Sequence, residues 1–292
     1  MKYGLRKGLT LGIVLFIILG SGIGAKAQSV ISKCKRDKLK TAVETYFGAL
    51  ESHNPSSLSL SETVKFTENG KEMDVEKGFG ETAGKALLKR SVFDEMKCSS
   101  HTQAVIEEAG RPIIYGVRLK LDGDKISEIE TFVAREKEFA FNAKGLLDTK
   151  DQDWESILPL EQRSSRLAMI AAADDYFNMF VVRPKVQVPF ASPCDRWENG
   201  TLTTVKTSNV SVIPGKPEHD CSPKGLKTLR HRPRRFLVDV RTGVVVAYVL
   251  FSSAVPDFHM FKMRNGKIEL IQAVIGANNS TMGWLEESVC IQ

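Results

Sequence analysis

The hydrophobic pattern of residues 259–275 is typical of a β-hairpin. Apolar and polar residues alternate up to the segment 264–267, and the alternation resumes after it. The pair Asn265-Gly266 at the centre of that segment favours the tight turn that joins two antiparallel strands. Residues 117–133 show the same pattern and align with 259–275 without a gap. The chain therefore contains a duplicated supersecondary element.

Two further motifs recur in the same order along the chain. Tyr46-Phe47 recurs as Tyr176-Phe177, and Glu68-Asn69-Gly70 recurs as Glu198-Asn199-Gly200. Three recurring motifs in one order predict a single unit that is written twice in tandem.

Each copy predicts a helix followed by strands, which is an α+β order. In the first copy we expect a helix at 32–50, a strand at 63–66, a loop leading into a short helix at 78–88, and strands at 102–107, 113–121 and 125–133. In the second copy we expect a helix at 167–180, a strand region at 186–197, a long insertion at 199–232, and strands at 235–240, 244–251 and in the hairpin. A polar stretch without a sustained period separates the copies, so we expect a first unit at 28–145, a linker at 146–162 and a second unit at 163–292.

Residues 1–27 have the pattern of a secretory signal peptide. Basic residues precede an apolar run from Leu9 to Leu19, and Ala25-Lys26-Ala27 supplies a small-x-small cleavage site. The run is shorter than the roughly 20 residues of a membrane span, so cleavage after Ala27 is favoured over an uncleaved anchor. We therefore expect a secreted or periplasmic protein with no stable membrane insertion after cleavage.

Removal of this segment changes the charge of the chain. The whole chain has a formal net charge of +6, with 41 basic and 35 acidic residues, and residues 1–27 hold four of the basic ones and none of the acidic ones. The mature chain is therefore nearly neutral, and we expect no nucleic-acid partner. A basic cluster remains, which we interpret as a solvated face, with a site for an anionic ligand as the alternative. Its members are Lys224, Lys227, Arg230, Arg232, Arg234 and Arg235.

Cysteines are expected to form disulfides in an oxidising compartment. Cys194 and Cys221 flank a loop rich in Gly, Pro, Ser and Thr, and we predict that they are bridged. Among Cys34, Cys98 and Cys290 one residue must remain unpaired, and the sequence leaves open which one.

The sequence lacks the standard catalytic signatures. It has no H-E-x-x-H, no G-x-S-x-G and no P-loop. The five histidines are scattered rather than clustered, so we expect neither a metal site nor a cofactor.

His259 is the main candidate for chemistry. Strand alternation places His259 on the same face as Phe261. The residue equivalent to His259 in the first copy is Val117, so a histidine replaces an apolar residue on this face. Asp257 would share this face and orient the imidazole for acid-base work. The alternative is a core histidine that one hydrogen bond satisfies. We name Arg196, Glu198, Tyr248 and Phe261 as candidate ligand-binding residues of the same unit.

Several sequence motifs resemble those of a known family. They are His53-Asn54-Pro55, Val64 through Gly70, Gly78-x-Gly80, Ser127 through Thr131, Cys194-x-Arg196-x-Glu198-Asn199-Gly200, and Pro233 through Val245. The chain is similar to secreted proteins that carry two fused nuclear transport factor 2-like (SnoaL-like) units and have no established function. The resemblance implies two tandem cone-shaped units, each with a curved antiparallel sheet packed on helices.

The resemblance does not imply an activity, because one fold hosts many functions. We predict a protein that binds a small, largely apolar molecule in a pocket of the second unit that includes His259. If it is an enzyme, we expect a cofactor-free lyase or isomerase with His259 as base, Asp257 as its orienter, and Arg196 or Tyr248 stabilising negative charge. The alternative is a non-catalytic binding or structural module that self-associates through its sheet faces.

Overall fold

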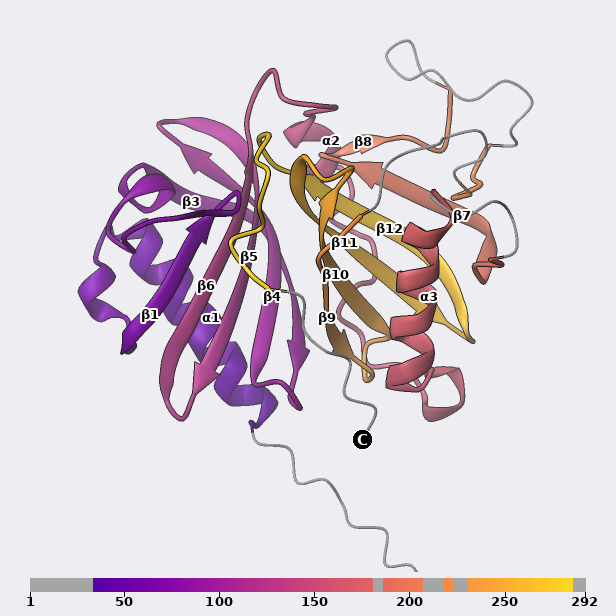
Figure 1. The fold of residues 1–292 in the computed structure, drawn as a ribbon, viewed down its shortest axis with the longest axis horizontal. Helices are drawn as coiled ribbons and strands as arrows, with labels where there is room; N and C mark the ends of the chain where they lie inside the picture. Colours follow the sequence, from indigo (N-terminus) through magenta and orange to yellow (C-terminus); the bar gives the residue numbers. More distant parts are fainter. Residues whose placement is uncertain (1–33, 181–185, 207–217, 223–230, 286–292) are drawn as a thin grey trace, which may run out of the picture. The chain divides into compact units, whose positions relative to one another are not determined.

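In the described part of the chain, twelve strands form two six-stranded sheets with the same strand order. The computed structural model describes residues 34–180, 186–206, 218–222 and 231–285. The first sheet has the order β2-β1-β6-β5-β4-β3, and the second has the order β8-β7-β12-β11-β10-β9 (Figure 1). The tandem α+β organisation predicted from the sequence is confirmed.

The elements of the first unit are α1 (Arg36–Glu51), η1 (Pro55–Ser57), β1 (Leu60–Glu68), β2 (Lys71–Glu72), η2 (Gly78–Glu81), β3 (Ala83–Asp94), β4 (Ser99–Glu108), β5 (Arg111–Asp122) and β6 (Lys125–Ala134). They are followed by α2 (Ala143–Leu147), η3 (Leu160–Gln162), α3 (Arg166–Asn178), β7 (Phe190–Glu198), β8 (Thr201–Leu202), β9 (Arg234–Asp239), β10 (Val244–Phe251), β11 (Val255–Arg264) and β12 (Lys267–Ile275).

The pairing register repeats as closely as the strand order. β1 is parallel to β6 and β7 is parallel to β12, whereas β5–β6 and β11–β12 are antiparallel. The β5–β6 register shifts between Lys120 and Leu121, and the β11–β12 register shifts between Lys262 and Met263. These residues are equivalent in the gapless alignment of the two hairpins. The alignment therefore holds in three dimensions.

Each long helix covers one face of its own sheet (Figure 1). In α1, Leu39, Val43 and Phe47 fall on one side because their spacing follows the helical period, and all three are buried. The equivalent α3 residues Met169 and Phe177 are also buried. The helical period in the sequence thus identified the inward faces correctly.

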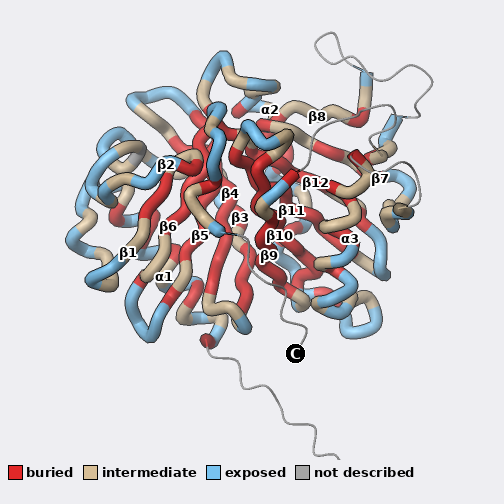
Figure 2. The backbone as a smooth tube through the Cα atoms, viewed as in Figure 1, coloured by how far each residue is buried: buried red, intermediate tan, exposed pale blue. Residues whose placement is uncertain are grey.

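The opposite faces of the two sheets pack against each other. One hydrophobic cluster joins residues of both sheets, among them Phe132 of β6, Tyr248 of β10 and Phe258 of β11. Phe132 stacks on Tyr248 with ring centroids 5.9 Å apart. Figure 2 shows that buried residues line the central strands of both sheets. The interior between the sheets is therefore a third core.

The short helix expected within residues 78–88 is wrong. The 3-10 turn η2 ends at Glu81, and β3 then extends over 12 residues. Gly84 and the consecutive pair Leu87 and Leu88 interrupt the alternation of apolar and polar residues that marks a strand. From Leu88 to Asp94 each residue is nevertheless paired with β4, because strand pairing outweighs local preference.

The basic cluster is a solvated face only in part: of its three described residues, Arg232 is exposed, whereas Arg234 and Arg235 are buried. Arg234 and Arg235 are each 4 % exposed. Arg234 donates to Asp174 at 2.6 Å, and Arg235 donates to Glu130 at 2.9 Å. Interior ion pairs, not hydration, account for these arginines. The signal segment 1–27, Lys224, Lys227, Arg230 and Cys290 lie outside the described residues.

The segment between the two units is more ordered than its composition indicated. Helix α2 extends across the boundary expected at residue 145, and Trp154 is 2 % exposed. The Asn142 N–H donates to the Asn199 carbonyl of the second unit at 2.8 Å. The segment therefore contributes packing as well as connection.

Candidate functional site

The residues predicted as a site in the second unit lie in its core. His259 is 2 % exposed and Asp257 is fully buried. Nδ1 of His259 lies 3.2 Å from Oδ1 of Asp257, so the two side chains share one face, as strand alternation requires. The rings of Tyr176 and Phe177 lie 5.5 and 5.1 Å from the imidazole. Aromatic side chains thus pack around the dyad.

Burial raises the pKa of the Asp257 carboxyl group, and His259 partly offsets this effect. Oδ2 of Asp257 has no hydrogen-bond partner among the described residues. A carboxyl group in such surroundings favours its protonated form. The hydrogen-bonded dyad is therefore suited to holding and moving a proton.

Arg196 and Glu198, at the end of β7, extend this polar cluster. Nε of Arg196 lies 3.1 Å from Glu198 Oε1, and Nη1 donates to the Tyr176 hydroxyl at 3.3 Å. Burial disfavours the charge of Arg196, but Tyr176 and Glu198 raise its pKa above the usual range. Burial raises the pKa of Tyr176 to about 12. The cluster thus combines a fixed cation with a protonated phenol.

Phe261 lies beside the dyad, with its ring stacked on that of His259 at 6.0 Å between centroids, whereas Tyr248 does not. Ala247, and not Tyr248, is paired with His259 across β10 and β11, so the Tyr248 side chain points to the opposite face. Its hydroxyl has no hydrogen-bond partner in the described residues. Phe261 is fully buried, with its ring centroid 5.0 Å from that of Tyr176. Both residues pack in cores.

Two cysteine pairs lie at disulfide distance. The sulfur atoms of Cys194 and Cys221, the pair predicted from the sequence, are 2.03 Å apart. Those of Cys34 and Cys98 are 2.11 Å apart. Nη1 of Arg196 donates to the Cys221 carbonyl at 3.2 Å. The first bridge therefore anchors a segment that holds the buried guanidinium.

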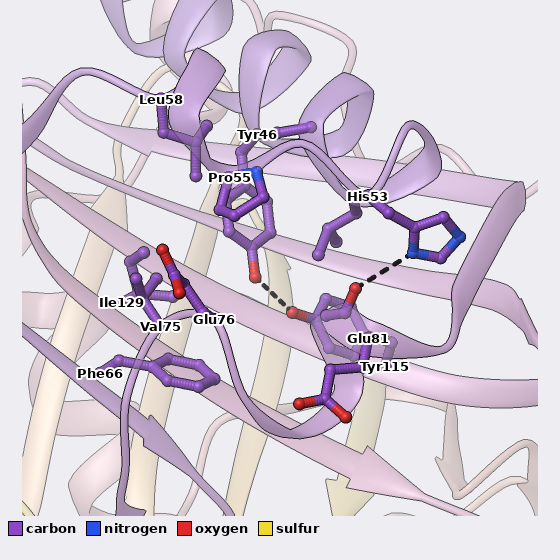
Figure 3. A pocket seen from close by; sticks show the side chains of 13 residues that line it. Tyr46, His53, Pro55, Leu58, Phe66, Val75, Glu76, Glu81, Tyr115 and Ile129 are labelled. Carbon is purple, nitrogen blue, oxygen red and sulfur yellow. Dashed lines mark hydrogen bonds between the residues drawn. The ribbon is translucent and has the colours of Figure 1, made fainter.

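A pocket of about 430 Å³ opens in the first unit between α1 and its sheet (Figure 3). Most of its wall is apolar and is formed by Ala49, Leu50, Pro55, Leu58, Phe66, Val75 and Ile129. A concave, mostly apolar site of this volume is typical of small-molecule binding. This pocket thus lies in the first unit.

Tyr46 of α1 and Tyr115 of β5 meet at the buried end of this pocket. Their hydroxyl oxygens are 2.6 Å apart, and Figure 3 shows the two side chains pointing toward each other. Burial raises the pKa of both phenols above the usual range, so both are protonated at neutral pH. One of the two protons forms the bond between them, and the other is directed elsewhere.

Polar residues stand at the exposed side of the pocket. His53 follows α1 in a left-handed backbone conformation, with φ 50°. Its Nδ1 lies 3.3 Å from the Gly80 carbonyl (Figure 3). That carbonyl belongs to η2. Glu76 and Glu81 are exposed, and Glu81 lies 3.8 Å from Lys77.

The repeat explains why the two units differ here. Tyr115 is equivalent to Asp257, so the second unit pairs a carboxyl group with a histidine where the first pairs two phenols. The pocket residues Leu50 and Phe66 are equivalent to Phe180 and Arg196, which both contact Tyr176. In the second unit, Phe180 and Arg196 therefore occupy the positions equivalent to two residues that line the pocket of the first unit.

The sequence also contains a signal for the tyrosine pair. Tyr115 stands two residues before Val117 and so shares its inward face. The change from Tyr115 to Asp257 is as polar as the change from Val117 to His259. A phenol at an inward position needs a hydrogen-bond partner, and Tyr46 on the facing helix supplies it. Glu81 stands in an exposed turn and gave no signal.

The described residues also bear on metal sites and membrane spans. No group of three or more His, Cys, Asp or Glu side chains there could hold a metal ion. No helix in the same ranges is long and apolar enough to cross a membrane.

Comparison with protein families and solved structures gives low similarities. A family model described as a domain of unknown function (DUF8021) matches residues 162–275, which run from η3 to the end of β12. A nuclear transport factor 2-like protein of unknown function from Cytophaga hutchinsonii is 12 % identical, covering 35 % of this chain and 94 % of its own, with a TM-score of 0.30.

Two further structures are similar to the same extent. A putative polyketide cyclase from Xanthomonas campestris is 11 % identical, covering 39 % of this chain and 96 % of its own, with a TM-score of 0.29. A de novo designed protein with a curved β-sheet is 16 % identical, covering 36 % and 92 %, with a TM-score of 0.31. Each of the three likenesses covers between 35 % and 39 % of this chain. No curated protein matches the chain.

Proposed function

We propose that the protein binds a small, largely apolar molecule in the pocket of the first unit. The observation that carries this proposal is the Tyr46–Tyr115 hydroxyl pair, 2.6 Å apart, at the end of an apolar pocket of about 430 Å³. Apolar walls supply affinity, and a few polar groups fix the orientation of a ligand. The second-unit pocket beside His259 that the sequence predicts stays a separate prediction.

The charges around the pocket favour a neutral ligand over an acid. His53 is the only basic residue among those that line it, whereas Glu76 and Glu81 are acidic. The charge of Glu68 also acts on both phenols. A carboxylate ligand would meet repulsion, whereas a hydroxyl or carbonyl oxygen would find a phenol donor. We therefore propose an alcohol or carbonyl compound as the ligand class.

Binding of decanol and decanoate tests this proposal, because the two probes share a chain length and differ in charge. We expect decanol to bind at least about tenfold more tightly than decanoate. Tyr46→Phe and Tyr115→Phe should each weaken decanol binding by about three- to tenfold. Tyr176→Phe, at the equivalent position of the second unit, is the control and should leave binding unchanged. Equal binding of both probes, or unchanged binding in both pocket variants, would refute the proposal.

A second candidate function is cofactor-free proton transfer in the second unit, by elimination or isomerisation. The observation that favours it is the 3.2 Å contact between His259 and Asp257, with Arg196 held near by Tyr176. His259 would act as base, Asp257 would orient it, and Arg196 would stabilise negative charge. Loss of turnover in His259→Gln with an unchanged fold would support this function. A module that pairs through its sheet faces is less favoured, because those faces contact each other within one chain.

We also propose that the protein is exported and cleaved after Ala27. The two cysteine pairs at disulfide distance fit an oxidising compartment. N-terminal sequencing of the exported protein tests the cleavage site, and a mature chain that still begins at Met1 would contradict it.

A further inference from the structure

The two units exchange ion pairs in both directions. Arg36, the first residue of α1, donates to Asp239 at the end of β9 at 2.7 Å. Arg166, the first residue of α3, donates to Asp94 at the end of β3 at 2.6 and 2.9 Å. Arg36 and Arg166 are separated by the same 130 residues as Tyr46 and Tyr176, so each pair is the repeat equivalent of the other.

The same carboxylates also bind the backbone of the opposite unit. Asp94 accepts from the Val238 N–H at 2.9 Å, and Asp239 accepts from the Phe93 N–H at 3.4 Å. Each carboxylate thus joins a helix start and a strand end of the other unit. The two units therefore exchange equivalent contacts to the backbone as well as between side chains.

The segments that leave the two sheets are exchanged in the same way. After β6, the Asn142 N–H donates to the Asn199 carbonyl at 2.8 Å. After β12, the Asn279 side chain donates to the Asn69 carbonyl at 2.9 Å. Asn69 and Asn199 are equivalent turn residues. Each unit therefore covers the Asn-Gly turn of the other.

Contacts that occur in both directions between equivalent residues define an isologous interface, as in a twofold dimer. In such an interface, a residue that touches its own equivalent lies at the axis. Gly116 and Phe258 are equivalent, and a Cβ atom at Gly116 would overlap the Phe258 ring. Phe258 is fully buried. The axis therefore passes beside these two residues.

We infer that the two units are an isologous pair about a pseudo-twofold axis at Gly116 and Phe258, and that unlike residues at this axis make each unit the specific partner of the other. The Phe258 ring occupies the space that the missing Gly116 side chain leaves. Two first units would place glycine against glycine and leave a void, whereas two second units would place two phenyl rings in one space.

A second unlike contact supports the same specificity. Arg235 donates to Glu130, which is fully enclosed with 1 % exposure. The equivalents of these residues are Arg90 and Gln272, and there Gln152 accepts from both, at 3.5 and 3.1 Å. The contact thus occurs at equivalent positions on both sides, but it is an ion pair on one side and a pair of amide-mediated hydrogen bonds on the other. Only the second unit supplies Arg235 as a partner for the buried Glu130.

Exchange of the two axial residues in the full chain tests the inference. Gly116→Phe and Phe258→Gly should each lower Tm by about 10 °C or more, through overlap and through a cavity. The double variant that carries both changes should regain most of this loss, because a pseudo-twofold axis makes the two arrangements alike. A double variant no more stable than the weaker single variant would overturn the inference.

The matched control exchanges equivalent residues that do not touch. Leu119 and Phe261 are repeat equivalents but belong to separate cores. Their single losses in Leu119→Phe and Phe261→Leu should add in the double variant. Recovery there as well would show that any exchange is tolerated, and it would remove the argument for an axis.

A cut in the connecting segment gives a second test that needs no core variant. A protease site inserted between Leu160 and Glu161, where Leu160 is 77 % exposed, can be cleaved in the folded full chain. We expect the two fragments to remain together on gel filtration at micromolar concentration. Native mass spectrometry of that peak should give the summed mass of one first and one second fragment. Separation of the fragments, or masses of like pairs, would overturn the inference.

Discussion

Arg166 at the start of α3 forms two hydrogen bonds with Asp94, which lies 72 residues earlier at the end of β3. The Asp94 side chain is fully buried, and that of Arg166 is 19 % exposed. The carboxylate also accepts from the backbone N–H groups of Met96, Lys97 and Val238. One side chain thus orders the β3–β4 turn, the β9 end and the start of a helix in the other unit.

Replacement of Asp94 should therefore cost far more than loss of an ordinary ion pair. We expect Asp94→Ala to lower the free energy of unfolding by about 3–5 kcal/mol, because Arg166 and three backbone donors lose a buried acceptor. Chemical denaturation of the purified variant measures this change.

Asp148→Ala is the matched control for this substitution. Asp148 pairs with Lys144 at 2.7 Å on the exposed surface of α2. Its removal should change stability by less than about 1 kcal/mol. Equal losses of unfolding free energy in the two variants would show that the interior ion pair stabilises the fold no more than an exposed one.

Much of the fold could be predicted because the repeat is visible in the sequence. The hairpins around Gly123 and Gly266 each combine strict alternation with a glycine turn, and they align without a gap. β3 was missed because Gly84 and the consecutive Leu87 and Leu88 interrupt the apolar alternation, and its pairing with β4 is not visible in the local sequence. Contacts such as Arg166–Asp94 join distant positions and depend on how the units pack, which local patterns do not encode.

The site was harder to predict than the fold. The sequence correctly placed Asp257 and His259 on one strand face. It could not show whether side chains of other elements fill the space beside them, and here Tyr176 and Phe177 do. Tyr248 was named from the order of the elements alone, and only the register of β10 against β11 shows that it lies opposite Phe258 and not His259. Cavity volume depends on packing between elements, so a pocket is not readable from one strand.

Stability should fall in acid because of His101. Its ring is fully buried against Phe258, at 4.2 Å, and both ring nitrogens lack partners among the described residues. Burial, with a smaller effect of Arg118, lowers its pKa from 6.5 to about 3. Between these two pH values the unfolded chain binds a proton that the folded chain does not. Stability is therefore present above pH 6.5 and decreases on acidification, by about 1.4 kcal/mol per pH unit.

His101→Leu should remove this share of the pH dependence. We expect a shallower decrease of Tm between pH 6.5 and pH 4.5, with stability at pH 7 unchanged or higher, because no buried polar group is left unpaired. Part of the decrease should remain, since burial also lowers the pKa of His231 to about 4. His53→Leu, which removes an exposed histidine, is the control. An unchanged slope in His101→Leu would contradict this account.

The two cysteine pairs should each contribute to stability. The bridged residues are 27 and 64 positions apart, which corresponds to about 3.5 and 4.3 kcal/mol on the chain-entropy estimate. Mass spectrometry of non-reduced peptides should recover Cys194 linked to Cys221 and Cys34 linked to Cys98. Reduction should lower Tm in proportion. Recovery of free thiols at these four positions from an oxidised preparation would show the pairing to be wrong.

The sequence and the structure lead to different expectations for the stability of His259→Val. From the sequence alone we expect an intact or improved fold, because Val117 serves at the equivalent position of the first unit. In the structure, Tyr115 and not an aspartate accompanies Val117, whereas Asp257 accompanies His259 at 3.2 Å. Valine would leave the fully buried Asp257 without this hydrogen bond. We therefore expect a loss of about 1–3 kcal/mol.

This loss should increase with pH, which separates it from a simple packing defect. Burial raises the folded-state pKa of Asp257 above its ordinary 3.8. A group with a raised folded pKa contributes stability that is present below its unfolded pKa and is lost as pH rises through the folded pKa. Without His259 to offset the charge, His259→Val should be closer to wild type at pH 5 than at pH 8. The double variant with Asp257→Asn should lose that difference, because no carboxyl group remains to ionise. Thermal unfolding at both pH values measures it, and a variant as stable as wild type at both would restore the expectation drawn from Val117.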